Sequence, residues 1–370
     1  MEKIKGFIKS QPVLAIAFVA AVVTMFIITP DKEYAGYINR TVLIELAALM
    51  AAVAGFRSIG IFDHVTGFIL RHTGNIRRLG VVMVLICFFS AMLVTNDVAL
   101  ITFVPLTLLI YSRIPDEKSG IMTIVLETVA ANMGSMLTPV GNPQNLYLFD
   151  EFGLTASVFI KTMLPAGAAG LICVLLLTLL LPKTPCDAPE SKDVHVSAVK
   201  GCAYGAMFVL CLLTVFRIVP DLICLAGSLA IVLVFDWRLL KKVDYALLAT
   251  FVCFFVFVGN IARIDEVSSF FSGILEGREL LISAALSQAI SNVPAAVMLA
   301  GFTDNGTKLM LGADLGGLGT VIASLASLIS FQFYRQAEGA KTGRYMLVFT
   351  VINFGLLAVL LGFEFVIGNI

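Results

Sequence analysis

The chain is dominated by long apolar runs that are separated by short polar connections. A run of about 20 apolar residues is long enough to cross the hydrocarbon of a bilayer as a helix. The pattern predicts nine full spans, at roughly 12–30, 41–56, 120–148, 157–181, 198–217, 221–236, 244–260, 308–333 and 345–367.

Two further apolar stretches are interrupted at their centres by polar residues. The first, 80–111, contains Thr95–Asp97, and the second, 279–302, contains Ser291–Pro294. We predict that each is a re-entrant hairpin, which enters and leaves the membrane on the same side. The sequence therefore predicts an all-α polytopic membrane protein with about nine full spans and two hairpins.

Composition agrees with a membrane protein. The 370 residues are 59% hydrophobic and only 14% charged, and the mean hydropathy is +0.98. A soluble domain is closer to about half apolar and about a quarter charged. The formal net charge of zero gives no reason to expect a nucleic-acid partner. The cysteines and histidines have no metal-binding spacing, so we predict no cofactor and no resident metal.

The distribution of basic residues predicts the orientation. Positive side chains concentrate on the cytoplasmic side of membrane proteins. With the N-terminus in the cytoplasm, nine spans and two hairpins, 18 of the 25 Lys and Arg residues fall on the cytoplasmic side and 7 outside. We therefore predict a multi-pass protein of the cell (inner or plasma) membrane with a cytoplasmic N-terminus and an external C-terminus.

The span at 120–148 contains an unusual segment, Asn132–Leu146, which reads NMGSMLTPVGNPQNL. Pro139 and Pro143 each remove a backbone donor and disrupt a helix. Broken helix at membrane depth is tolerated only where it is buried in protein or lines a polar cavity. We predict that this segment is an unwound part of a binding site.

An internal repeat is visible at an offset of 182 residues. It aligns Asn132 with Asp314 and Asn142 with Ser324. With the predicted topology the two repeats are inverted, an arrangement typical of secondary transporters with a site at the repeat interface. The predicted regions are 1–30, a first transmembrane helix; 31–181, repeat 1 with hairpin 80–111 and broken helix 120–148; 182–200, a cytoplasmic linker; 201–236, connecting scaffold helices; and 237–370, repeat 2 with hairpin 279–302 and broken helix 308–333.

Four motifs resemble the ion transporter superfamily, and most of all its citrate-transporter-like members, which are related to divalent-anion/sodium symporters and arsenite permeases. They are TNDVALITFVPL (95–106), GSMLTPVGNPQNLYL (134–148), SNVPAAVML (291–299) and LGGLGTVIASLASLI (315–329). The resemblance implies a dimerising scaffold, hence a homodimer, and a transport domain that moves across the membrane. It also implies one anion held between the hairpin tips and the broken helices, with sodium beside it.

The candidate site combines the tips with the two breaks. Residues that offer hydroxyl, amide or unwound backbone groups to a small anion are Thr95, Asn96, Thr138, Gly141, Asn142, Pro143, Asn145, Ser291, Asn292, Thr320 and Ser324. A carboxylate at bilayer depth is unfavourable unless it is paired or functional. The predicted ligands for a coupling Na+ or H+ are Asp97, Asn132, Asp314 and Ser327.

Three functions compete at this point. The leading one is a secondary active transporter of a carboxylate or oxyanion, coupled to Na+ or H+. Within transport, the alternative is a Na+/H+ antiporter or an arsenite-type efflux permease, which can work with a separate ATPase. No Walker A motif is present, so the chain is not itself an ATPase. The third is an intramembrane aspartyl protease that pairs Asp97 with Asp314. We interpret the other span carboxylates, Glu45 and Glu127, as structural.

Overall fold

The computed structural model of the protein describes residues 11–61, 74–112, 114, 116–185 and 197–368. Among these residues the structure is helical, with strand pairing limited to an isolated bridge between Asn75 and Pro185. The helices are α2 (Pro12–Ile27), α3 (Tyr34–Tyr37), α4 (Arg40–Ser58), α6 (Ile76–Val94), α7 (Asn96–Tyr111), α8 (Glu117–Ser135), α9 (Pro143–Glu151), α10 (Ala156–Thr178), α11 (Ala198–Val215), α12 (Asp221–Phe235), the 3-10 helix η1 (Trp237–Lys242), α13 (Tyr245–Ala262), α14 (Asp265–Leu275), α15 (Glu279–Ile290), α16 (Asn292–Ala300), α17 (Gly306–Leu315), α18 (Leu325–Gln336) and α19 (Thr342–Val366).

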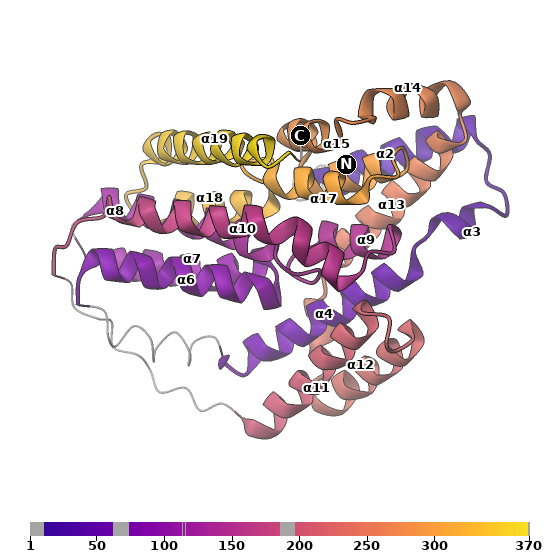
Figure 1. Ribbon diagram of the computed structural model, residues 1–370. Coiled ribbons are helices and arrows are strands. Elements are labelled where there is room, and N and C mark those ends of the chain that lie inside the picture. The colour runs from indigo at the N-terminus through magenta and orange to yellow at the C-terminus, as the bar shows by residue number, and fades with distance from the viewer. Residues whose placement is uncertain (1–10, 62–73, 113, 115, 186–196, 369–370) are drawn as a thin grey trace, which may run out of the picture.

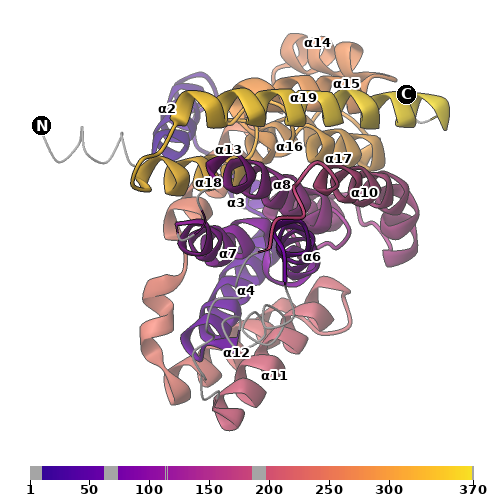
Figure 2. The same cartoon turned by 90° about the vertical axis from the view of Figure 1, so that its left-hand side faces the viewer.

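The helices form three groups around a shared centre. Helices α6, α7, α8, α10, α18 and α19 lie side by side in the part at the left of Figure 1. Helices α4, α11 and α12 pack together with η1 at the bottom, and α13 packs on α2, α3 and α14 at the right. The short helices α9, α15, α16 and α17 connect these groups, because α9 contacts α4, α16 and α17. Figure 2, turned by 90°, shows α8 enclosed by α6, α7, α10, α18 and α19.

Several helices have the length and composition of membrane spans. Six of the described helices are long and apolar enough to cross on their own: α4, α6, α10, α11, α13 and α19. Of the predicted full spans, those at 120–148 and 308–333 are broken, and α2 and α12 are shorter apolar helices. Large apolar side chains such as Phe26 and Leu347 are exposed on α2 and α19, as expected for surfaces that face lipid. The prediction of an all-α polytopic membrane protein is confirmed.

Helix starts follow from short polar residues that satisfy the free N–H groups of a first turn. The Asn39 side chain accepts a hydrogen bond from the N–H of Val42 and begins α4. Asp116 begins α8 in the same way by accepting from the N–H of Ser119. These capping residues place the starts of α4 and α8 within a few residues of the starts predicted from the apolar runs, at 41 and 120.

Both interrupted stretches form helix–turn–helix pairs. Helices α6 and α7 are joined by Thr95 alone, and α15 and α16 are joined by Ser291 alone. The outer ends of α6 and α7 lie together at the left of Figure 1, away from their shared turn. The first hairpin begins at Ile76, four residues before the predicted start.

Both predicted broken helices are interrupted. The first is helical over α8 and α9 and leaves 136–142 outside helix, whereas the second is helical over α17 and α18 and leaves 316–324 outside helix. The second break forms although it contains no proline. Gly319 adopts a φ of 107°, a conformation that favours glycine. The Gln288 side chain holds this segment by donating to the carbonyl oxygens of Gly316 and Leu318.

The connection between the two halves is only partly described. Helix α11 begins at Ala198, inside the range predicted for the cytoplasmic linker 182–200. Most of that linker, 186–196, lies outside the described residues, as do 1–10 of the predicted first helix region.

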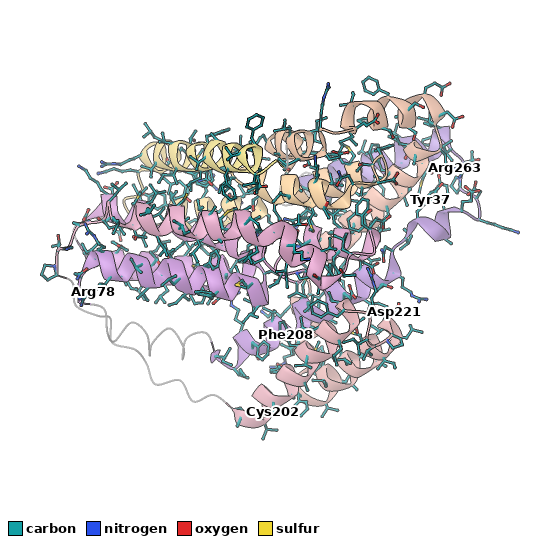
Figure 3. The ribbon with its side chains drawn as sticks, in the orientation of Figure 1. Tyr37, Arg78, Cys202, Phe208, Asp221 and Arg263 are labelled. Atoms are coloured by element: carbon teal, nitrogen blue, oxygen red, sulfur yellow. The ribbon has the colours of Figure 1, made fainter. Side chains whose placement is uncertain are left out.

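A polar clasp outside the spans predicts a pH effect on stability. The Arg263 guanidinium, at the end of α13, lies 2.8 Å from Asp31 and donates to the Tyr37 hydroxyl at 3.0 Å (Figure 3). The hydrogen bond from Arg263 lowers the pKa of the Asp31 carboxyl below its usual value of 3.8. A lowered pKa in the folded state stabilises the protein above the unfolded pKa, and the effect is lost as pH falls through the folded value.

We therefore expect Asp31→Asn to reduce thermal stability slightly at neutral pH. The difference from the unchanged protein should begin to shrink as pH falls to about 4, the pKa of free aspartate, and should vanish only below the lowered pKa of Asp31 in the folded protein. Thermal unfolding in detergent across this pH range measures it. A difference that persists at low pH would mean that the clasp stabilises through something other than the carboxylate charge.

Candidate functional site

Each hairpin turns at a residue with unusual backbone geometry. Thr95 has φ 77° and ψ 150°, and Ser291 has φ 75° and ψ 152°. Positive φ is unfavourable for a residue with a side chain and above all for a β-branched one such as threonine. Such strain persists where the surrounding structure enforces it, often at functional sites. Both turns are thus held in nearly the same conformation.

The tip of each hairpin is bonded to a broken helix. The N–H of Asn96 donates to the carbonyl oxygen of Gly141 at 3.1 Å, and the N–H of Asn292 donates to that of Ala323 at 2.9 Å. Gly141 and Ala323 are 182 residues apart, the offset of the predicted repeat. The two tips therefore bind equivalent positions of the two breaks.

A second pair of contacts shows the same equivalence. The Thr138 hydroxyl donates to the carbonyl oxygen of Met92 in α6, and the Thr320 hydroxyl donates to that of Gln288 in α15. The threonines are again 182 residues apart, and both acceptors lie three residues before the strained turn. Both predicted site threonines thus fasten an unwound segment to a hairpin arm.

Asn132 joins elements from both halves of the chain. Its Oδ1 accepts from the Asn96 Nδ2 at 3.0 Å and from the Ser324 hydroxyl at 3.1 Å. Its Nδ2 donates to the carbonyl oxygen of Gly317 at 3.4 Å. Asn132 is buried, so the first hairpin, the first broken helix and the second break meet in one polar cluster.

Asp314 makes the corresponding connection in the opposite direction. Its Oδ1 accepts from the Asn142 Nδ2 and from the Gln144 Nε2, both at 2.9 Å. Asn142 also caps α9, because its Oδ1 accepts from the N–H of Asn145. Asn142 and Ser324 are repeat mates, and each precedes a half-helix. Asn142 bonds Asp314 and Ser324 bonds Asn132, and these two partners are repeat mates as well. These matched cross-contacts support the predicted repeat.

Three buried oxygens at this centre lack a hydrogen-bond partner in the described structure. They are Asp314 Oδ2, Asn145 Oδ1 and Ser327 Oγ. Asn145 lies beside Asp314, and Asn145 and Ser327 are repeat mates. Unsatisfied buried oxygens are unfavourable and point to an absent partner. Carboxylate, amide and hydroxyl oxygens are suitable ligands for a small hard cation.

The electrostatics at the centre come from backbone as well as side chains. The N-termini of α7, α9, α16 and α18 converge there, since Asn96, Asn142, Asn292 and Ser324 all belong to the contacts above. A helix N-terminus carries free N–H groups and partial positive charge. Pro143 stands at the first position of α9, where its missing N–H leaves no gap in the helix. The convergence makes an environment that suits an anion.

Asp97 meets this hydrogen-bonded cluster through its backbone, because its N–H donates to the Asn96 Oδ1 at 2.9 Å; the contacts of its carboxylate lie elsewhere. It lies in the first turn of α7 and interacts electrostatically with Asp244, whereas Asp314 interacts with the amides of α9. The contacts of the described residues do not bring the two carboxylates together, as the aspartyl protease alternative would require. The role of Asp97 as a coupling-ion ligand stays a prediction.

The structure adds residues that the sequence analysis did not select. Gln144 bonds Asp314, and Gln288 holds the second break through both its Nε2 and its Oε1, which accepts from the N–H of Thr320. Gln144 lies within the motif NPQN, so its neighbours could have identified it. Gln288 stands three residues before the Ser291 tip, next to Ser287 in a largely apolar arm, and its polar side chain at that position was its only signal.

A helical membrane protein with two strained hairpin tips, two broken helices and a buried polar centre belongs to the class of membrane transporters. The sequence profile of the citrate transporter family matches residues 1–306. The chain belongs to this family, and it is a transporter rather than an enzyme. The predicted superfamily resemblance is confirmed.

Known relatives agree with this class. An uncharacterized transporter of Methanocaldococcus jannaschii is 32% identical over 324 residues, which cover 87% of this chain and 88% of the relative. An inner membrane protein of Escherichia coli, YbiR, is 30% identical over 323 residues, with 84% of each chain covered. A silicon efflux transporter of Oryza sativa subsp. japonica, LSI3, is 26% identical over 179 residues, 48% of this chain and 36% of the relative.

Proposed function

We propose that this protein is a secondary active transporter of a small anion, a carboxylate or oxyanion, coupled to Na+ or H+. The single observation that carries the proposal is the unpartnered Asp314 Oδ2 at the meeting point of four helix N-termini. The N-termini and amides suit an anion, and the carboxylate suits a cation. Binding the two together neutralises charge in a buried site, which is what coupling requires.

The coupling cation is proposed to bind Asp314 with the oxygens of Asn145, Ser327 and Asn132. Asp314 has no ion-pair partner among the described residues. An uncompensated buried charge is strongly unfavourable. A bound Na+ or a proton would compensate it. Asp97 remains a proposed second cation ligand near the first tip.

The anion is proposed to lie between the tips and the breaks. Asn96 and Asn292 start the second arms of the hairpins, and Asn142 and Ser324 start the half-helices. The tips read Thr-Asn-Asp and Ser-Asn-Val, so each tip supplies a single hydroxyl group to the anion. The family name favours citrate or a similar carboxylate, and the name of the rice relative, a silicon efflux transporter, makes hydroxylated oxyacids worth testing.

An elevator motion is proposed, in which hairpins and broken helices move together against α4, α11 and α12. Contacts between these parts are polar at one end of α9. Arg217, in the α11–α12 connection, donates to the carbonyl oxygens of Phe149 and Asp150 at 2.9 Å and 3.3 Å. Asn39, at the start of α4, donates to the Asp150 carboxylate at 2.8 Å. As the hairpins and broken helices slide against α4, α11 and α12, hydrogen bonds of this kind can be replaced by hydrogen bonds to water. A homodimer in the cell membrane, with a cytoplasmic N-terminus, completes the proposal.

The test is transport by the purified protein in proteoliposomes under imposed Na+ or H+ gradients. Citrate, succinate, arsenite, silicate, phosphate and sulfate are compared with no added substrate. Anion-dependent cation uptake is the expected result. Na+/H+ exchange without any added anion would replace the proposal with antiport. Arsenite extrusion that needs a separate ATPase would replace it with arsenite-type efflux.

Asn142→Ala and Asn292→Ala are expected to raise the substrate concentration for half-maximal transport. A hydrogen bond to a charged group contributes about 1.5–3 kcal/mol, which corresponds to roughly 10–100-fold in affinity. Asn353→Ala is the matched control, because this buried amide donates to Phe349 within α19. Unchanged transport kinetics in both site variants would show that the anion binds elsewhere.

A further inference from the structure

A second buried carboxyl group lies apart from the central cluster. Glu127, in α8, is fully buried. Its Oε1 accepts a hydrogen bond from the Thr107 hydroxyl of α7, and its Oε2 has no partner in the described structure. Oε1 thus accepts a hydrogen bond, as the carbonyl oxygen of a protonated carboxyl group does. Oε2 lacks the hydrogen-bond donors that an ionised carboxylate requires. Glu127 is five residues from Asn132 and belongs to none of the contacts of the proposed site.

No positive charge in the described part of the chain compensates Glu127. Among the described residues it forms no ion pair. Helices α6, α7, α10, α17, α18 and α19 pack against α8, and the titratable side chains that interact with Glu127 from them are the Cys87 thiol and the Tyr345 phenol. The basic residues of these helices stand near their ends, at Arg77, Arg78, Lys118, Lys161, Lys308, Arg335 and Arg344. An ionised Glu127 would therefore be an isolated buried charge, which is unfavourable by several kcal/mol.

A seam of hydroxyl groups leads from Glu127 towards one end of the protein. Helices α7 and α8 run antiparallel, and the Tyr111 and Thr123 hydroxyls form a hydrogen bond of 2.9 Å one turn outward from the Thr107–Glu127 bond. Tyr111 is the last residue of α7. On both helices the polar residues are four apart, so they share one face. The seam thus reaches the end where α7 and α8 are connected.

The seam stops before it reaches the central cluster. Between Thr107 and Asn96, α7 contributes the buried apolar side chains of Phe103 and Leu100, and the facing part of α8 contributes Ala131. The next polar contact of the two helices is Asn96 with Asn132. Between α7 and α8, hydroxyl groups therefore adjoin Glu127 on one side only, whereas towards α18 the neighbouring Thr128 hydroxyl donates to the Ser330 hydroxyl.

We propose that Glu127 is a proton-binding site that exchanges its proton with the aqueous phase at the α7–α8 end through the hydroxyls of Thr107, Thr123 and Tyr111. Oε2 carries the proton, and Oε1 is the carbonyl oxygen that accepts from Thr107. On release, a turn of the carboxyl group brings the protonated oxygen to the Thr107 hydroxyl, which takes this proton and gives its own onward along the seam to water, so that Glu127 is left as a carboxylate. A role of this site in coupling rests on the proposed transport function, whereas proton binding itself does not.

Infrared difference spectroscopy of the purified protein tests the proposal without transport. At neutral pH free glutamate is ionised, with a pKa of about 4.3, so a carboxylic acid C=O band at pH 7 reports a buried protonated group. Glu127→Gln should remove one such band. Glu45→Gln is the matched control, because Glu45 is also buried with an unpartnered Oε2 but lies in α4; the band assigned to Glu127 should survive it.

Thr107→Val supplies a second variant that leaves the carboxyl in place. Removing the donor to Oε1 should move the band to higher frequency, and breaking the seam should slow the shift on transfer to D2O roughly tenfold. Absence of the band in the unchanged protein, or its persistence in Glu127→Gln, overturns the proposal. Unaltered exchange in Thr107→Val overturns the route. A protein that shows the band but transports no anion would refute the transport function and leave the proton site standing.

Discussion

Replacing Asp314 with asparagine is expected to abolish ion-coupled transport while leaving the fold intact. The substitution keeps the shape of the side chain and an Oδ1 that can accept from Asn142 and Gln144. It removes the negative charge and turns the unpartnered Oδ2 into an amide nitrogen. A cation that is bound by this oxygen therefore loses both its charge partner and a ligand.

The measurement is thermal unfolding in detergent with Na+ or with an organic cation, followed by transport. A ligand at about 100 times its dissociation constant stabilises the folded protein by about 2.7 kcal/mol. We expect the unchanged protein to gain stability with Na+ or with falling pH, and Asp314→Asn to gain none. Asp265→Asn, on the exposed face of α14, should behave like the unchanged protein. Full ion dependence in Asp314→Asn would contradict the assignment of the cation site.

Gly134→Ala is expected to have the largest effect on the structure itself. A Cβ at Gly134 would lie 2.0 Å from the carbonyl oxygen of Phe88, which belongs to the backbone of α6. Helix α6 must then move away from α8, and with it the Thr95 tip. Overpacking in a buried site costs about 1–3 kcal/mol, and here the displaced atoms are backbone that cannot change rotamer. Loss of folded protein or of substrate binding is expected.

The comparison that tests this is with two other glycines. Gly316 is the repeat mate of Gly134, and a Cβ there would lie 2.7 Å from the Cα of Ala284 in α15. Gly316→Ala should therefore also be damaging. Gly205, in α11, has no atom within 4 Å of the added carbon, so Gly205→Ala should be tolerated. Equal unfolding temperatures for Gly134→Ala and Gly205→Ala would show that the close approach of α6 and α8 does not matter.

The helices were the most predictable part of the structure, because apolar length decides them. The predicted spans at 41–56, 157–181, 198–217 and 244–260 correspond to α4, α10, α11 and α13 within a few residues. The first break could be predicted from Pro139 and Pro143. The second break was harder, because its unwinding depends on glycines and on Gln288 from a distant hairpin arm.

The central contacts were only partly predictable, because they cross between the halves of the chain. The repeat offset identified Asn132 and Asp314 as equivalent, but an offset does not show that each bonds a half-helix of the other repeat. Sequence treated Asp97 and Asp314 alike, as carboxylates in apolar surroundings. Their different neighbours come from helix rotation and packing, which single-sequence patterns do not specify. Glu127 was interpreted as structural because it lies five residues before Asn132, more than one helical turn away, and its contact with Thr107 of another helix becomes visible only in the structure.

The bond between Asn142 and Asp314 has a consequence for biogenesis. The two residues are 172 positions apart in the chain. At synthesis rates of about 5–20 residues per second, Asn142 emerges from the ribosome roughly 10–30 s before Asp314 does. During that interval the amides of Asn142 and Gln144 lack their final acceptor within the membrane. The polar segment of the first half must therefore be shielded from lipid until the second half is inserted.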